Sequence, residues 1–115
     1  MVRPLILLAA SMAILVACDR KVAGGAVDGA QVFAAACATC HGPGGVPPAS
    51  MVASLRVRDL TDLAFRARAS RDLIVNQVRR GSENKLMPSF TGALSDAQMN
   101  AVADYVLTLP VKTAP

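Results

Sequence analysis

The chain has 115 residues and a formal net charge of +4, which suit one small domain and give no indication of a nucleic-acid partner. Hydrophobic residues make up 53% of the chain, but it has only three Phe, one Tyr and no Trp. Because alanine supplies much of the apolar fraction and buries little area per residue, the sequence predicts a thin core. A large apolar cofactor would supply much of the missing core.

The first residues indicate an export signal. Arg3 gives a positive start, and residues 5–17 form an apolar run that is too short to span a bilayer. We therefore expect a signal peptide over residues 1–17.

The end of this signal resembles a bacterial lipobox, with the sequence Leu15-Val16-Ala17-Cys18. Cys18 would then be lipidated and become the first residue of the mature protein. The resemblance implies that Asp19 favours retention at the inner membrane. The alternative is an ordinary secretory signal followed by a stray cysteine, which would leave the protein soluble in the periplasm.

The motif around which the chain is organised is Cys37-Ala38-Thr39-Cys40-His41, the attachment signature of a c-type haem. Residues three apart at a helix end share one face, so both sulfurs can reach the two vinyl groups of one porphyrin. His41, the only histidine in the chain, would then lie near the iron.

Three other interpretations compete with haem attachment. A dithiol redox motif expects a strand–helix unit around it, and no strand pattern is present. A closed zinc site needs four ligands, and the chain has no second Cys or His pair. A plain disulfide in an exported protein is the third. The cysteine count favours haem, because haem uses Cys37 and Cys40 and lipidation uses Cys18. Haem attachment outside the cytoplasmic membrane also agrees with export.

The segment after the lipobox predicts a flexible tether at residues 18–27, because it is short and rich in Gly and Ala. Asp28 and Gln31 resemble a capping box and begin the first helix, which should carry the cysteine motif and end at Gly42.

Residues 49–58, in the middle of the chain, show no clear hydrophobic period. A short helix is expected to follow and to run through residue 68, with Thr61 or Asp59 as its N-cap. A further helix is expected over residues 70–80, with Gly81 as its stop. Its expected buried stripe consists of Leu73, Ile74 and Val78. Four arginines precede it and indicate a solvated face, a contact with a haem propionate or a docking patch for an acidic partner: Arg56, Arg58, Arg66 and Arg68.

The last helix is expected over residues 95–109, since Ser95 and Gln98 form a capping box and Pro110 stops the helix. Met99 falls on the apolar stripe of this helix and is therefore expected to be a core residue. Residues 111–115 are expected to be a tail.

These motifs resemble the small class I cytochromes c, over roughly residues 28–109. The matching positions of the first helix are Gly29, Phe33, Cys37, Cys40, His41 and Gly42. The resemblance implies that Gly29 and Phe33 pack closely against Val102 and Tyr105 of the last helix. It also implies that a loop proline, Pro47 or Pro48, offers its carbonyl to the ring of His41.

The segment Leu86-Met87-Pro88-Ser89-Phe90 resembles the distal-ligand segment of the same family. The resemblance implies Met87 as the second axial ligand of the iron, and Pro88 would stiffen the loop that delivers it. Met51 is a poorer candidate and Met99 is expected in the core.

We therefore expect an all-α cytochrome c fold of three to five helices, wrapped around one covalent haem c, over residues 28–110. The implied function is a membrane-tethered one-electron carrier with His41 and Met87 on the iron, serving redox partners of a respiratory chain on the periplasmic side. It would not be an enzyme. The alternatives are a haem c subunit of a larger oxidase or dehydrogenase and, if Met87 is not bound, a ligand-binding sensor or weak peroxidase.

Overall fold

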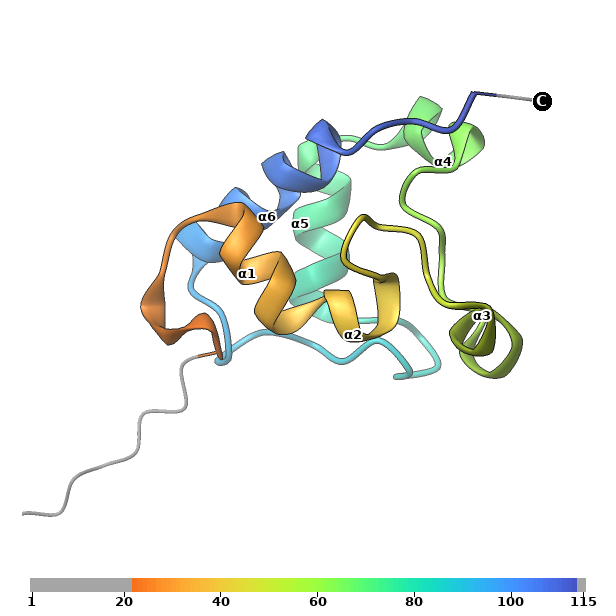
Figure 1. The fold of residues 1–115 in the computed structure, drawn as a ribbon. Helices are drawn as coiled ribbons and strands as arrows, with labels where there is room; N and C mark the ends of the chain where they lie inside the picture. Colours follow the sequence, from red (N-terminus) through yellow and green to blue (C-terminus); the bar gives the residue numbers. More distant parts are fainter. Residues whose placement is uncertain (1–21, 114–115) are drawn as a thin grey trace, which may run out of the picture.

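Helices α1 (Gly29–Ala36) and α6 (Asp96–Thr108) cross at the centre of the structure and make the most extensive contact between its elements (Figure 1). A β-carbon at Gly29 would overlap the carbonyl oxygen of Ala101 and lie 2.8 Å from the Cβ of Tyr105. One turn along, the rings of Phe33 and Tyr105 lie 5.3 Å apart and are tilted by 54°. The predicted packing of Gly29 and Phe33 on the last helix is confirmed.

The computed structural model describes residues 22–113. Around the α1–α6 pair lie the remaining elements: the 3₁₀ turn η1 (Val22–Gly25), α2 (Ala38–His41), α3 (Ala49–Leu55), α4 (Leu63–Arg68) and α5 (Arg71–Arg80). Residues 22–113 contain no β-strand, and the predicted all-α fold is confirmed, with six α-helices in this range where three to five were expected. Within this range no helix has the length and apolar character needed to cross a membrane. The expected signal peptide (residues 1–17) and Cys18 lie outside the described residues.

Three helix starts were predicted correctly from their caps. The Asp28 carboxylate accepts the N–H of Gln31 at 3.0 Å, and the Ser70 hydroxyl accepts that of Leu73 at 3.1 Å. At α6 both bonds of the capping box are present between Ser95 and Gln98.

The start of α4 was predicted incorrectly. Its cap is Asp62, whose carboxylate accepts the N–H of Phe65 at 2.9 Å, and neither Thr61 nor Asp59. The Asp59 carboxylate instead accepts both the N–H and the hydroxyl of Thr61, at 2.8 and 2.6 Å, so both side chains are already bonded.

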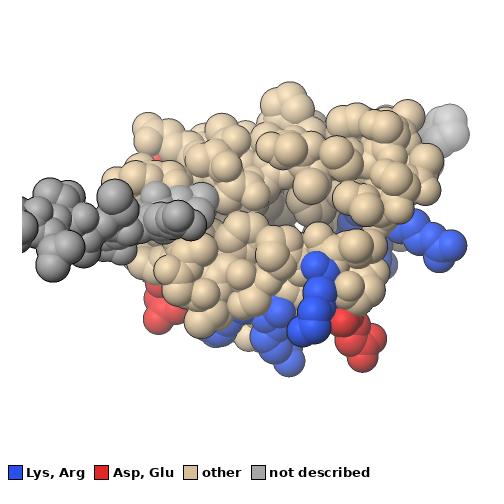
Figure 2. All heavy atoms as spheres, turned by 90° about the horizontal axis from the view of Figure 1, so that it is seen from below, with Lys and Arg blue, Asp and Glu red and all other residues tan. Residues whose placement is uncertain are grey.

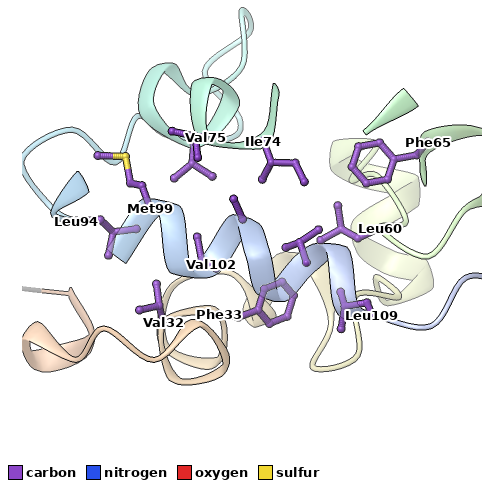
Figure 3. Packing of buried hydrophobic residues seen from close by; sticks show 13 residues of the cluster. Val32, Phe33, Leu60, Phe65, Ile74, Val75, Leu94, Met99, Val102 and Leu109 are labelled. Atoms are coloured by element: carbon purple, nitrogen blue, oxygen red, sulfur yellow. The ribbon is translucent and has the colours of Figure 1, made fainter. Parts of the chain in front are cut away.

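The core lies between α1, α5 and α6. Val32 and Phe33 face α6 from one side and Ile74 and Val75 from the other (Figure 3). Met99 is buried on α6, as predicted. The predicted stripe of α5 was wrong at one position: Leu73 is 44% exposed, because the face turned to α6 consists of Ile74, Val75 and Val78.

The segment before α1 is packed on the domain. Ala23 lies against the core cluster, and the side-chain nitrogen of Gln98 donates to the carbonyl of Ala26 at 3.0 Å. The expected free tether at residues 18–27 is therefore not free over residues 22–27. Gln98 belongs to both the capping box of α6 and this anchor, a long-range role that sequence spacing does not reveal.

Candidate haem-binding site

The two motif cysteines lie at a break between α1 and α2. Cys37 has a backbone φ of −122°, which ends α1, and α2 begins at the next residue with Cys40 and His41 in its single turn. All three side chains are half-buried, and both thiols are free. Burial, with a smaller contribution from nearby Cys40, raises the pKa of the Cys37 thiol to about 11. Cys37 therefore stays protonated at neutral pH before the haem is attached.

The ring of His41 is oriented by the main chain of Arg58. Its Nδ1 lies 3.0 Å from the Arg58 carbonyl oxygen. Because a carbonyl can only accept, Nδ1 donates the proton, and Nε2 keeps the lone pair that a metal requires. Burial lowers the pKa of His41, although the bond to Arg58 acts in the opposite direction, so the neutral ring is favoured.

The expected acceptor, a carbonyl of Pro47 or Pro48, is wrong. The carbonyl of Pro48 accepts the N–H groups of Met51 and Val52, at 2.9 and 3.1 Å, and so starts α3. The sequence showed no clear period over this segment, so α3 was missed. The chain beyond α3 supplies the acceptor instead.

Met87 lies in the loop between α5 and α6, where Ser82 fixes its backbone. The Met87 N–H donates to the Ser82 hydroxyl oxygen at 3.0 Å, and the Ser82 N–H donates to the Met87 carbonyl at 2.9 Å. The Ser82 hydroxyl in turn donates to the side-chain oxygen of Asn84 at 2.6 Å. A β-carbon at Gly81, where φ is +73°, would lie 2.5 Å from the Met87 carbonyl oxygen.

The three methionines of the described chain differ in exposure. Met87 is half-buried and packs against the core cluster, whereas Met99 is enclosed within it. Met51 is half-buried on α3, a helix without a fully buried residue. Among these sulfurs, only that of Met87 is carried by a loop whose backbone is clamped in place.

The structure fits a haem c on two grounds. First, α2, which carries Cys40 and His41, and α3 contain no fully buried residue, so their apolar side chains remain accessible to a large apolar group. Second, the available donors are two free thiols, an imidazole with Nε2 available and a thioether. Among the described residues, no group of three His, Cys, Asp or Glu side chains is arranged so that it could hold a metal ion by itself.

The shape of the molecule agrees with this fit. Helix α2 and the loop after α5 both lie at the lower edge in Figure 1. Figure 2 looks at the molecule from below and shows a surface hollow near its middle, with Lys and Arg side chains along one margin.

Comparisons with known proteins identify the family. A family model described as cytochrome c oxidase, cbb3-type, subunit III matches residues 24–106. Cytochrome c6 of Microcystis aeruginosa is 40% identical over 80 residues, which are 70% of this chain and 91% of that protein. Cytochrome c6 of Synechococcus sp. (strain ATCC 27167 / PCC 6312) is 41% identical over 80 residues, 70% of this chain and 66% of that protein. The solved KustC0563 c-type cytochrome gives a TM-score of 0.65 at 26% identity, over 72% of this chain and 98% of that one.

The chain belongs to the class I c-type cytochromes. As a member of this family it is an electron carrier with one covalently bound haem c, and it is not an enzyme, as predicted. The cytochrome supplies the complete attachment motif for that group, from Cys37 to His41.

The arginines of the cytochrome have structural partners that sequence reasoning missed. The Arg66 guanidinium donates to the carbonyls of Leu107 and Leu109 and so caps the C-terminal end of α6. Arg68 donates to the carbonyl of Ala64. The Arg58 guanidinium lies 5.7 Å from the centre of the Phe65 ring. The acceptors of Arg66 lie more than forty positions away in sequence, so the residue pattern alone could not separate its role from a solvated face.

Proposed function

We propose that this cytochrome is a one-electron carrier whose iron is held by His41 and Met87, and that lipid on Cys18 holds it at the periplasmic face of a bacterial membrane. Its partners would be redox proteins of a respiratory chain. The observation that carries the ligation is the pair of fixed donors: an imidazole oriented by the Arg58 carbonyl, and a thioether on a loop clamped by Ser82.

Each ligand has a separate task. The haem supplies an iron that gains and loses one electron. The bond from His41 to Arg58 fixes the ring and raises its basicity. The thioether of Met87 favours the ferrous state. If both side chains hold the iron, they would leave no position for a substrate, and little rearrangement would accompany electron transfer.

The ligation is tested by absorption spectroscopy of the ferric protein. We expect a far-red band from methionine–iron charge transfer in the wild type and in Met51→Ala, and its loss in Met87→Ala. Met51→Ala is the matched control because Met51 is the other methionine outside the core. A band that survives in Met87→Ala would refute the assignment. Absence of the band from the wild type would favour the ligand-binding alternative.

The membrane tether is supported by the lipobox and by the docked turn at Val22–Gly25. Because the turn packs on the domain, only Asp19, Arg20 and Lys21 separate Cys18 from it. The four peptide links from Cys18 to Val22 reach about 14 Å at full extension. The end of the domain that carries η1 would therefore stay next to the bilayer, which favours partners in the same membrane. Asp19 directly after Cys18 indicates that this membrane is the inner one.

Fractionation of the host and mass analysis test the tether. We expect the wild type in the membrane fraction with acyl chains on Cys18, and Cys18→Ser in the soluble periplasmic fraction with its haem intact. A wild type that is soluble and unacylated would support the alternative of an ordinary secretory signal.

A second function is favoured by the family match. The matching model is described as a subunit of a cbb3-type oxidase, which supports the alternative of a haem c subunit within a larger complex. Purification from gently solubilised membranes distinguishes the two. A stable stoichiometric complex would support the subunit, and a monodisperse single chain would support the separate carrier.

A further inference from the structure

The C-terminal segment of the cytochrome is bound to the domain. The N–H of Lys112 donates to the carbonyl of Thr61 at 2.8 Å, and its ammonium lies 2.5 Å from the carboxylate of Asp59. The sequence predicted a free tail over residues 111–115, and this prediction is wrong at Lys112. Lys112 thus bonds to one short stretch of chain, at Asp59 and Thr61, that lies more than fifty positions earlier in the sequence.

That stretch is the one that carries the acceptor for the axial histidine. Asp59 directly follows Arg58, whose carbonyl bonds the ring of His41. Other contacts also hold this stretch: the Leu60 N–H donates to the carbonyl of Gly45 at 2.8 Å, and the Arg58 guanidinium lies over Phe65. The Asp59 carboxylate also accepts the N–H and the hydroxyl of Thr61, so the bond from Lys112 adds the C-terminal segment to an anchor that is already present. On the other side α3 ends at Arg56 in a left-handed conformation, with φ of +53°.

We propose that Lys112 is a positioning residue for His41. The ammonium of Lys112 fixes Asp59, and the peptide next to Asp59 then holds the Arg58 carbonyl in line with Nδ1 of His41. The hydrogen bond at Nδ1 is thereby kept, and with it the orientation and basicity of the ring. The inference rests on the proposed role of His41 as an iron ligand. The C-terminal segment thus tunes the reduction potential from outside the haem pocket.

The direction in which the reduction potential changes distinguishes the loss of positioning at His41 from the loss of one positive charge. A weaker bond at Nδ1 makes the ring less basic, which destabilises the ferric state and raises the potential. Loss of a positive charge acts in the opposite direction, because a nearby cation disfavours the additional charge of ferric iron. Lys112→Ala therefore raises the potential if positioning dominates and lowers it if only charge matters.

The experiment is potentiometric titration of the holoprotein in four variants. We expect a higher potential than wild type in Lys112→Ala and in the charge-balanced Asp59→Asn/Lys112→Ala, and the wild-type value in Lys112→Arg. The matched control is Arg71→Ala, which removes one cation from another exposed ion pair, with Asp104 at 2.8 Å on α5 and α6. It should show no rise.

A second readout reports the hydrogen bond itself. Proton exchange at His41 Nδ1, followed by NMR, should be faster in Lys112→Ala than in wild type and unchanged in Arg71→Ala. A potential that is unchanged or lower in Lys112→Ala, with wild-type exchange, would overturn the proposal. The far-red band of the wild type reports axial ligation independently, so failure of the proposed function is seen separately.

Discussion

Ser82 holds the backbone of Met87 through hydrogen bonds from both its hydroxyl and its own backbone N–H. The hydroxyl oxygen of Ser82 accepts the Met87 N–H at 3.0 Å, and the Ser82 N–H donates to the Met87 carbonyl at 2.9 Å. The loop between them is short and exposed, with Lys85 at a φ of +61°. The position of the thioether therefore depends on a hydroxyl five residues earlier.

Removal of this hydroxyl should loosen Met87. In Ser82→Ala the Met87 N–H loses its acceptor, which costs about 1–3 kcal/mol. Since about 1.4 kcal/mol corresponds to a tenfold change in an equilibrium constant, the population of the open loop rises by about that factor for each 1.4 kcal/mol. We expect the far-red band to disappear at a lower guanidinium concentration than in wild type. Ser82→Thr, which keeps the hydroxyl, should behave like wild type. Thr108→Ala removes a hydroxyl bonded to Tyr105 in α6 and serves as the control; an equal loss there would refute the role of Ser82.

Gly29 should be intolerant of any side chain. A methyl group there would overlap the carbonyl of Ala101, so Gly29→Ala should lower the free energy of unfolding by about 1–3 kcal/mol, as overpacking does. Gly44→Ala is the matched control because no heavy atom lies within 4 Å of its β-carbon position, and it should change stability by less than about 0.5 kcal/mol. Denaturant unfolding of the holoprotein measures both. Equal stability of the two variants would contradict the close crossing of α1 and α6.

The ion pair between Asp59 and Lys112 should give stability a pH dependence. Desolvation acts to raise the pKa of Asp59, but the hydrogen bonds from Lys112 and Thr61 outweigh it and lower the pKa below its usual range. A depressed carboxylate contributes stability above the ordinary pKa of about 3.9 and loses it as the pH falls through the folded value. The stability gap between wild type and Asp59→Asn should thus be largest at neutral pH and close in acid. A gap that stays constant down to about pH 2.5 would show that ionisation of Asp59 is not its source.

Removal of the haem should affect the helices unequally. Helices α1, α5 and α6 share the core, whereas α2 and α3 have no fully buried residue. In Cys37→Ala/Cys40→Ala, which cannot attach the haem, amide hydrogens of α3 should exchange rapidly while those of α6 stay protected. In the holoprotein both should be protected. Rapid exchange of α3 in the holoprotein would mean that the haem does not pack on it.

Sequence reasoning predicted most of what depends on neighbouring residues, although it missed Asp62 as the cap of α4. The caps at Asp28, Ser70 and Ser95 were found because the cap and its partner lie three residues apart. The cysteine motif implied the cofactor because all of its residues lie within five consecutive positions. The packing of Gly29 on the last helix was implied by the family resemblance.

What sequence reasoning missed depends on contacts between distant segments. Arg58 acts through its carbonyl, which every residue possesses, so its identity gave no signal. Lys112 in the predicted tail and Gln98 at the docked turn each bond a partner more than fifty positions away. Helix α3 was missed because none of its residues is fully buried, so the segment shows no hydrophobic period.

Packing of α3 on the haem, if the exchange experiment bears it out, would give the cell a means of quality control. A chain without its porphyrin would then present residues 49–55, and the loop that follows, as a loosely held substrate for proteases. Turnover would then remove the colourless form selectively. We expect the steady-state amount of this protein to follow haem supply, even when transcription of its gene is held constant.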